Sequence, residues 1–181
     1  MKEIRTNLKI IASNLIRQSG YNAFSFRDLA DEVGLKSSSV HYYFPTKADL
    51  VEEIIMDYKE AFFENLEAQT AKMSLTTNKL LFLIRLYEES LSNNLNCLCG
   101  MLASEIDLLS TKEQKALKGF YNRLEEWLNL EIVDATVKID IKASEVVHLI
   151  MSSLNGAIVL DRAYKRKKNF NALKSFISIA V

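Results

Sequence analysis

Residues that interrupt helices are rare in this chain, which has five glycines and one proline among its 181 residues. An all-β protein of this length needs many turns, and glycine and proline form most of them. Apolar residues instead recur at spacings of three and four, as they do along one face of an α-helix. The sequence therefore predicts an all-α fold of about nine helices, without a stretch that alternates as a β-strand does.

Local capping signals divide the chain into its expected helices. Three pairs have the spacing of a capping box, in which each residue's side chain satisfies a free backbone N–H of the other: Ser25 with Asp28, Thr46 with Asp49, and Ser110 with Glu113. Asp140 is expected to cap a later helix. We therefore expect helices over residues 2–19, 25–33, 37–44, 47–70, 77–93, 97–109, 110–135, 141–166 and 169–180.

The overall charge gives no general attraction to nucleic acid, because 23 basic residues balance 23 acidic ones. Binding to DNA would therefore need a local surface of suitable residues. From residues 1–5 we expect no secretory signal, and the longest apolar stretch, residues 146–160, is shorter than the roughly 20 residues of a membrane-spanning helix. We expect a cytoplasmic protein without a membrane partner.

Cys97 and Cys99 raise the question of a metal or redox site. Two thiols supply half of a four-ligand zinc site, and His41 and His148 lie far away in the sequence. Free cysteines are among the most buried residues, so we favour a packing role and keep a thiol sensor as the alternative. No metal site and no cofactor are predicted.

The segment from Phe24 to Leu50, FSFRDLADEVGLKSSSVHYYFPTKADL, has the organisation of a helix-turn-helix. Its first helix leads into Gly34, which can adopt the left-handed conformation of a tight turn. A second short helix follows and ends before Pro45, because the residue before a proline resists the helical conformation. In such a unit the second helix enters the major groove and offers its first residues to the base edges.

Polar side chains around the second helix are the expected DNA contacts. The serines at its start allow close approach to the bases and can donate or accept hydrogen bonds. His41 and Tyr42 are expected to face away from the core, although His41 without any role is the alternative. Thr46 and Lys47 begin a helix whose free N–H groups attract phosphate. The full predicted set is Arg27, Lys36, Ser37, Ser38, Ser39, His41, Tyr42, Thr46 and Lys47.

This stretch resembles the DNA-binding domain of TetR-family (tetracycline-repressor-like) regulators over residues 5–55. The matching features are Phe24-Ser25, Asp28-Leu29-Ala30, Gly34 with Leu35, Val40 through Phe44, and Lys47 with Leu50. Two residues depart from the family pattern: His41 stands where tyrosine is common, and Lys36 stands where serine is common. These departures leave open which residue makes the phosphate contact usually given to that tyrosine.

The resemblance implies a homodimeric repressor that binds a palindromic operator and releases it when a small-molecule effector binds. It implies a DNA-binding domain over residues 1–46 and a ligand-binding and dimerisation domain over residues 47–181, joined by the long helix that begins at Lys47. The last two helices of each subunit would pair with those of its partner. The expected interface residues are Ser152, Ser153, Gly156, Ala157, Leu160, Leu173, Phe176 and Ile177.

The effector pocket is expected among the middle helices, with plain core packing as the alternative for each apolar candidate. These candidates are Phe62, Tyr87, Met101, Glu105, Phe120, Trp127, Met151 and Asn155. A regulator controlled by a protein partner is the alternative function. An enzyme is not favoured, because no nucleophile–base pair, glycine-rich phosphate loop or metal-binding set is recognisable, and no catalytic residue is predicted.

The basic run over residues 165–168 has two interpretations. It follows one expected helix and precedes the next, and positive charge is favoured near a helix C-terminus. We expect a solvated turn, and a nucleic-acid patch is the alternative.

Overall fold

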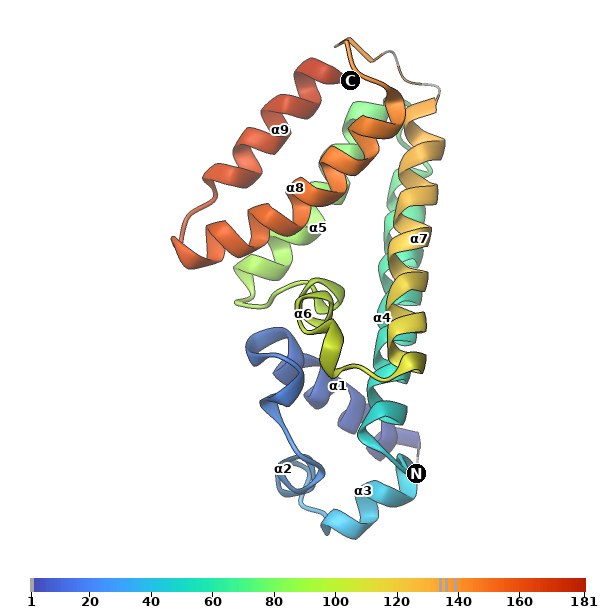
Figure 1. The fold of residues 1–181 in the computed structure, drawn as a ribbon, viewed down its shortest axis with the longest axis vertical. Coiled ribbons are helices and arrows are strands. Elements are labelled where there is room, and N and C mark those ends of the chain that lie inside the picture. Colours follow the sequence, from blue (N-terminus) through green and yellow to red (C-terminus); the bar gives the residue numbers. More distant parts are fainter. Residues whose placement is uncertain (1, 134, 136, 139) are drawn as a thin grey trace. The chain divides into compact units, whose positions relative to one another are not determined.

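The computed structural model describes residues 2–133, 135, 137, 138 and 140–181, and within these residues the chain is helical without a strand (Figure 1). The predicted all-α fold class is confirmed. The α-helices are α1 (Lys2–Ser19), α2 (Phe26–Glu32), α3 (Ser37–Tyr43), α4 (Lys47–Thr70), α5 (Thr76–Ser92), α6 (Leu98–Ser104), α7 (Thr111–Val133), α8 (Ala143–Ala163) and α9 (Lys168–Ala180), and the 3-10 helices are η1 (Tyr21–Ala23) and η2 (Ile106–Leu108).

Two expected elements differ from the observed ones. The helix expected over residues 97–109 is divided into α6 and η2, because the backbone of Glu105 leaves the helical conformation at φ −119° and ψ 30°. The prediction that Asp140 caps α8 is wrong. The helix begins after Lys142, whose backbone N–H donates to the Glu145 carboxylate at 2.9 Å. An acidic residue three positions after Lys142 satisfies that N–H, so the cap forms there.

The chain divides into two compact units. Unit 1 comprises residues 1–61 and 98–120, and unit 2 comprises residues 62–97 and 121–181. Helices α4 and α7 therefore each supply residues to both units. These units do not follow the division at residue 46, because α6 and the start of α7 belong with the N-terminal helices. The functional division into residues 1–46 and 47–181 stays a prediction.

Unit 1 is built on the apolar stripe of α1. Leu8, Ala12 and Ile16 recur at spacings of four and are fully buried. Burying a leucine or isoleucine side chain contributes roughly 1.5–3 kcal/mol, so this stripe is a large part of the core of unit 1. On its more polar side, Arg5 donates to Glu53 of α4 at 2.5 Å, which adds a directed contact between the two helices.

Unit 2 is organised around α8, which packs against α5 and α9. The α8 side chains Val146, Val147, Ile150 and Leu154 are buried. Among the described helices α8 has the length and hydropathy of a membrane-spanning helix, but core helices of globular proteins pass the same test. Its contacts with two neighbouring helices account for part of its apolar composition, because 33% of the apolar window is buried within the chain.

Asp161 near the end of α8 fixes the start of α9. Its fully buried carboxylate accepts the backbone N–H groups of Asn169 at 3.1 Å and Phe170 at 3.0 Å, and the Asn169 side-chain amide at 2.6 Å. Burial raises the pKa of Asp161, but the hydrogen bonds and the charge of Arg166 outweigh burial and lower the pKa overall. One side chain thus caps α9 and holds it against α8.

We predict that Asp161→Asn lowers the free energy of unfolding at neutral pH by roughly 1–3 kcal/mol, because charged hydrogen bonds are lost. The folded-state pKa lies below that of the unfolded chain. The ionised carboxylate therefore stabilises the fold above the unfolded pKa of about 3.9, and this contribution is lost as pH falls through the folded-state pKa. Urea unfolding as a function of pH measures both effects. Asp140→Asn, at an exposed aspartate, is the control and leaves stability unchanged.

Candidate nucleic-acid interface

Helix α2 begins at the predicted capping box. The Ser25 backbone N–H donates to Asp28 Oδ2 at 2.7 Å, and the Asp28 backbone N–H donates to Ser25 Oγ at 3.3 Å. The hydrogen bonds from Ser25 lower the pKa of Asp28, so its carboxylate is ionised at the positive end of the helix. Leu29 and Ala30 are buried on the inner face of α2.

A tight turn at Gly34 joins α2 to α3. The glycine has φ +68°, and the Leu35 backbone N–H donates to the Ala30 carbonyl at 2.8 Å, which closes the end of α2. A side chain at residue 34 would meet no atom within 4 Å, so the requirement for glycine comes from backbone conformation and not from space. Helix α3 begins three residues later, and α2 and α3 pack closely together.

Helix α3 has an apolar inner face and a polar outer face. Val40 is fully buried, as is Phe44 directly after the helix. Ser37 and Ser38 are exposed at the start of the helix, and the Tyr42 ring is 75% exposed near its end. The prediction that Tyr42 faces away from the core is therefore confirmed, and its side chain is open to solvent.

His41 is exposed but contacts its neighbours. Its Nδ1 lies 3.3 Å from the Pro45 carbonyl oxygen, and its ring meets the Phe26 ring edge-on at 4.8 Å between centroids. The histidine therefore connects α2, α3 and the turn before α4. Its orientation away from the core agrees with the sequence, while its phosphate contact stays a prediction.

The start of α4 is more constrained than the sequence suggests. Lys47 Nζ donates to the Phe24 carbonyl oxygen at 2.8 Å and lies 4.2 Å and 4.6 Å from the ring centroids of Phe24 and Tyr21. Burial lowers the pKa of Lys47, and this effect is opposed by the charges of Glu113 and Glu105. In this conformation the ammonium group holds the turn before α2, and its role as a phosphate ligand stays a prediction.

Thr46 and Asp49 form the expected cap of α4. The Thr46 backbone N–H donates to Asp49 Oδ2 at 2.8 Å, and the Asp49 backbone N–H donates to Thr46 Oγ1 at 3.1 Å. Lys112 of α7 forms an ion pair with Asp49. A phosphate near Thr46 would therefore approach a helix start that already has a carboxylate beside it.

The nine predicted DNA contacts lie on a continuous stretch of chain from α2 to the start of α4. Exposed are Arg27, Lys36, Ser37, Ser38, His41, Tyr42 and Thr46, while Ser39 and Lys47 are half-buried. The exposed members combine two cations with hydroxyl groups around one short helix. Such a set provides both phosphate contacts and hydrogen bonds to base edges.

Two acidic residues that support this surface come from the α6–α7 segment of unit 1. The Glu105 carboxylate accepts the Tyr21 backbone N–H at 2.7 Å. Glu113 is fully buried. Burial of the Tyr21 side chain, together with the charge of Glu113, raises the pKa of Tyr21. The assignment of Glu105 to an effector pocket is therefore corrected, because its carboxylate is bound to the turn between α1 and α2. No local signal in the sequence identifies a contact between residues so far apart.

The remaining pocket candidates are divided between the two units. Met101 and Phe120 belong to unit 1, whereas Phe62, Tyr87, Trp127, Met151 and Asn155 belong to unit 2. In unit 2, the Phe62 and Tyr87 rings meet edge-on at 6.2 Å, and Asn155 Nδ2 donates to the Met151 carbonyl at 2.9 Å. The Asn155 Oδ1 atom is buried without a hydrogen-bond partner among the described residues. Unit 2 thus contains the larger share of the candidates.

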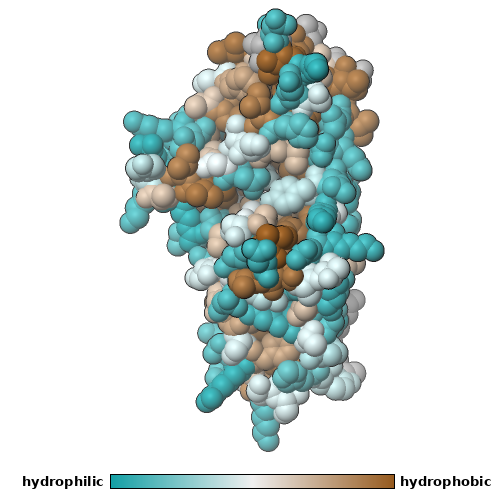
Figure 2. Space-filling model, in the orientation of Figure 1, coloured by the Kyte–Doolittle hydropathy of each residue, from teal (hydrophilic) through white to brown (hydrophobic). Residues whose placement is uncertain are grey.

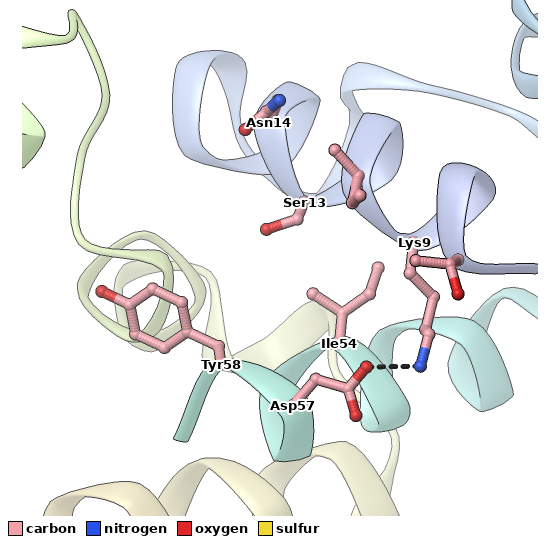
Figure 3. Close-up of a pocket in the computed structure, with 8 residues that line it drawn as sticks. Lys9, Ser13, Asn14, Ile54, Asp57 and Tyr58 are labelled. Carbon is pink, nitrogen blue, oxygen red and sulfur yellow. Dashed lines mark hydrogen bonds and ion pairs between the residues drawn. The ribbon is translucent and has the colours of Figure 1, made fainter. Parts of the chain in front are cut away.

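An unpredicted hollow of about 260 Å³ lies on α1 and α4 in unit 1 (Figure 3). The close-up shows Lys9 and Asp57 joined by an ion pair across it, with Ser13 and Tyr58 on opposite helices. The hollow is open to solvent, and its charged groups are paired with one another. Its ion pair joins α1 to α4.

The predicted interface residues lie mostly on one face of α8 and α9. Six of them line a hollow of about 360 Å³: Ser153, Gly156, Ala157, Leu160, Leu173 and Phe176. Ser152 lines a neighbouring hollow with His148 and Leu149. Ile177 is fully buried within its own chain, so its assignment to the interface is corrected to a core position behind that face.

Cys97 and Cys99 are also buried, which agrees with a packing role.

Comparison with known proteins places the helix-turn-helix among bacterial regulators. A family model described as bacterial regulatory proteins, tetR family, matches residues 11–54, which include α2 and α3. The chain is 36% identical over 59 residues to the HTH-type transcriptional repressor KstR2 of Rhodococcus jostii. That match covers 33% of this chain and 29% of the relative's length.

Two solved structures extend the similarity to the whole chain. A TetR-family transcriptional regulator from Agrobacterium tumefaciens is 24% identical, with a TM-score of 0.92 over 99% of this chain and 98% of that one. A TetR transcriptional regulator from Legionella pneumophila is 29% identical, with a TM-score of 0.86 over 95% of this chain and 94% of that one. The fold of the described part of the chain is therefore shared with regulators of this family.

We predict that Ser25→Ala lowers the free energy of unfolding by about 1 kcal/mol, because the cap of α2 is lost. Urea denaturation followed by circular dichroism measures the loss. Ser38→Ala is the matched control, since Ser38 is exposed on α3 and caps no helix. Equal stability losses in the two variants would contradict the role assigned to the cap.

Proposed function

Because the chain belongs to the TetR family of bacterial regulatory proteins, we propose that it is a repressor that binds a palindromic operator as a homodimer and is released by a small-molecule effector. The main support for this proposal is that Ser37, Ser38 and Tyr42 are exposed on α3. The capped helix α2 and the turn at Gly34 fix the position of α3. Such a helix-turn-helix offers one helix to the major groove.

Binding to DNA would rest on this local surface, because the chain has no net charge. Arg27 and Lys36 are exposed at the start of α2 and directly before α3, where they would contact phosphates on either side of the recognition helix. The serines and Tyr42 would read base edges or contact the sugar–phosphate backbone. Two copies of the chain would present two such helices to the two halves of an inverted repeat.

Dimerisation would use the face of α8 and α9 that contains the hollow described above. Leu160 is 46% exposed and Val159 is 61% exposed beside small residues such as Gly156, which permits close approach of another helix. Exposed apolar side chains gathered on one face are typical of surfaces that pair with another protein. A second copy of the same face would cover them symmetrically.

The effector would bind in unit 2, near Phe62, Tyr87 and Asn155. The aromatic rings offer apolar contacts, and the buried Asn155 Oδ1 is an acceptor for a donor on the ligand. Helices α4 and α7 supply residues to both units, so a ligand that moved them in unit 2 would act on unit 1. The chain would act in the cytoplasm, where its DNA is, and would bind without catalysis.

For DNA binding, we predict that Arg27→Gln and Lys36→Gln each weaken binding to all duplexes alike and reduce the slope of log affinity against log salt by about one. Ser38→Ala changes which base is preferred and leaves that slope unchanged. Fluorescence anisotropy over a salt series, with an operator chosen from a random duplex library and its single-base variants, measures both.

Lys72→Gln is the control for charge alone, because Lys72 is exposed in unit 2 and away from the helix-turn-helix segment of the sequence. Its binding should match that of the unmodified protein. If Ser38→Ala and Arg27→Gln lose affinity equally on every duplex, the separation of base and phosphate contacts is wrong.

For dimerisation, we predict that Leu160→Asp converts the dimer to a monomer, because an unpaired carboxylate buried in an interface costs several kcal/mol. Sedimentation velocity measures the change. Leu130→Asp is the matched control, since Leu130 is 71% exposed on α7. A dimer that tolerates Leu160→Asp would place the interface elsewhere.

A further inference from the structure

The basic run forms the expected exposed turn after α8, and three of its residues, Lys165, Arg166 and Lys167, also line a hollow. The hollow has a volume of about 240 Å³ and lies within unit 2, between the end of α5 and the turn after α8. Figure 2 shows hydrophilic side chains at this turn. The lining residues come from two separate segments of the chain: Leu91, Ser92 and Asn94 from one, and Asp161, Arg162, Lys165, Arg166 and Lys167 from the other.

The charge of this lining is strongly unbalanced. It has four cationic side chains and one carboxylate, Asp161, in a chain whose formal net charge is zero. The Asp161 carboxylate is fully buried and already accepts the N–H groups of Asn169 and Phe170. The ion pairs found among the described residues include neither Lys165 nor Arg166. The hollow therefore has a surplus of positive charge.

Several contacts keep these cations close together. Lys167 Nζ donates to Ser92 Oγ at 2.9 Å and so joins the two segments. The Arg166 guanidinium lies 4.1 Å from the centre of the Tyr164 ring, and the Arg166 backbone N–H donates to the Asp161 carbonyl at 2.9 Å. These contacts limit how far the side chains can separate, although like charges repel one another.

The backbone is also unusual at this hollow. Lys165 has φ +50° and Asn94 has φ +58°, and these are the non-glycine residues with positive φ in the described part of the chain. Both line the hollow, one from each segment. The left-handed conformation is unfavourable for a lysine, so the surrounding contacts must compensate for it. Both segments that line the hollow therefore contain a residue in the left-handed backbone conformation.

We propose that this hollow binds the phosphate groups of a small phosphorylated molecule. A cleft lined mostly by charge of one sign attracts counterions, and the Arg166 guanidinium can donate two hydrogen bonds to one phosphate. The Lys165 ammonium adds a point charge. A small ligand is favoured over DNA or a membrane because the lining is concave. The site goes beyond the proposed function and does not depend on it.

Calorimetric titration of the intact protein with inorganic pyrophosphate, at constant ionic strength and without DNA, tests the proposal. The expected result is saturable binding of one pyrophosphate per chain. In the double variant Lys165→Asn and Arg166→Gln, affinity falls at least about tenfold, because charged hydrogen bonds are lost. Asparagine is chosen for residue 165 because it tolerates positive φ. Lys167→Gln, which alters one side chain only, is expected to weaken binding in the same direction.

The matched control is the double variant Lys72→Gln and Lys142→Gln, which removes two exposed lysines of unit 2 that do not line the hollow. It retains full affinity for pyrophosphate. Absence of saturable binding, or equal loss in both double variants, would overturn the proposal. Binding of duplex DNA or anionic vesicles through Lys165 and Arg166, without binding of pyrophosphate, would overturn it in favour of a surface for larger polyanions. None of these outcomes depends on operator binding.

Discussion

The candidate interface depends on the tight turn between α2 and α3. Gly34 has φ +68°, a conformation that costs other residues roughly 1–2 kcal/mol, and the Leu35 N–H closes the end of α2 on the Ala30 carbonyl. This turn sets the direction in which α3 leaves α2. Because Val40 is then directed into the core, the opposite face of α3 is directed outward. The recognition surface is thus a consequence of one backbone conformation and a few buried side chains.

Charged groups inside unit 1 hold the segment between α1 and α2. The Lys47 ammonium is bound to the Phe24 carbonyl, and the Glu105 carboxylate is bound to the Tyr21 N–H. A side chain at Gly20, which has φ +94°, would lie 2.7 Å from that carboxylate, so the close approach also requires glycine. Partly buried charges are costly unless they are bound, and here each is bound to a backbone group. Residues of the α6–α7 segment therefore fix the chain immediately before α2, which connects α2 and α3 to the rest of unit 1.

The sequence predicts features that local chemistry determines. The caps at Ser25 and Thr46 form as expected because each involves residues three positions apart, and the outward position of Tyr42 follows from helical periodicity. It does not predict contacts between distant segments. Neither the binding of Glu105 to the turn after α1 nor the position of Ile177 behind the α8–α9 face has a local signal, because both depend on how helices pack. The DNA contacts themselves, the effector pocket and the dimer interface stay predictions for the same reason.

The central claim is that α3 and its neighbours read a specific DNA sequence in a dimer. Fragments of the source genome bound by the purified protein, recovered at moderate salt without an effector and then sequenced, test it most directly. The account predicts one or a few short inverted repeats, with half-sites about one helical turn apart, roughly 10 base pairs, or a multiple of that spacing. Recovery of no sequence above background, or of fragments without an inverted repeat, would contradict it.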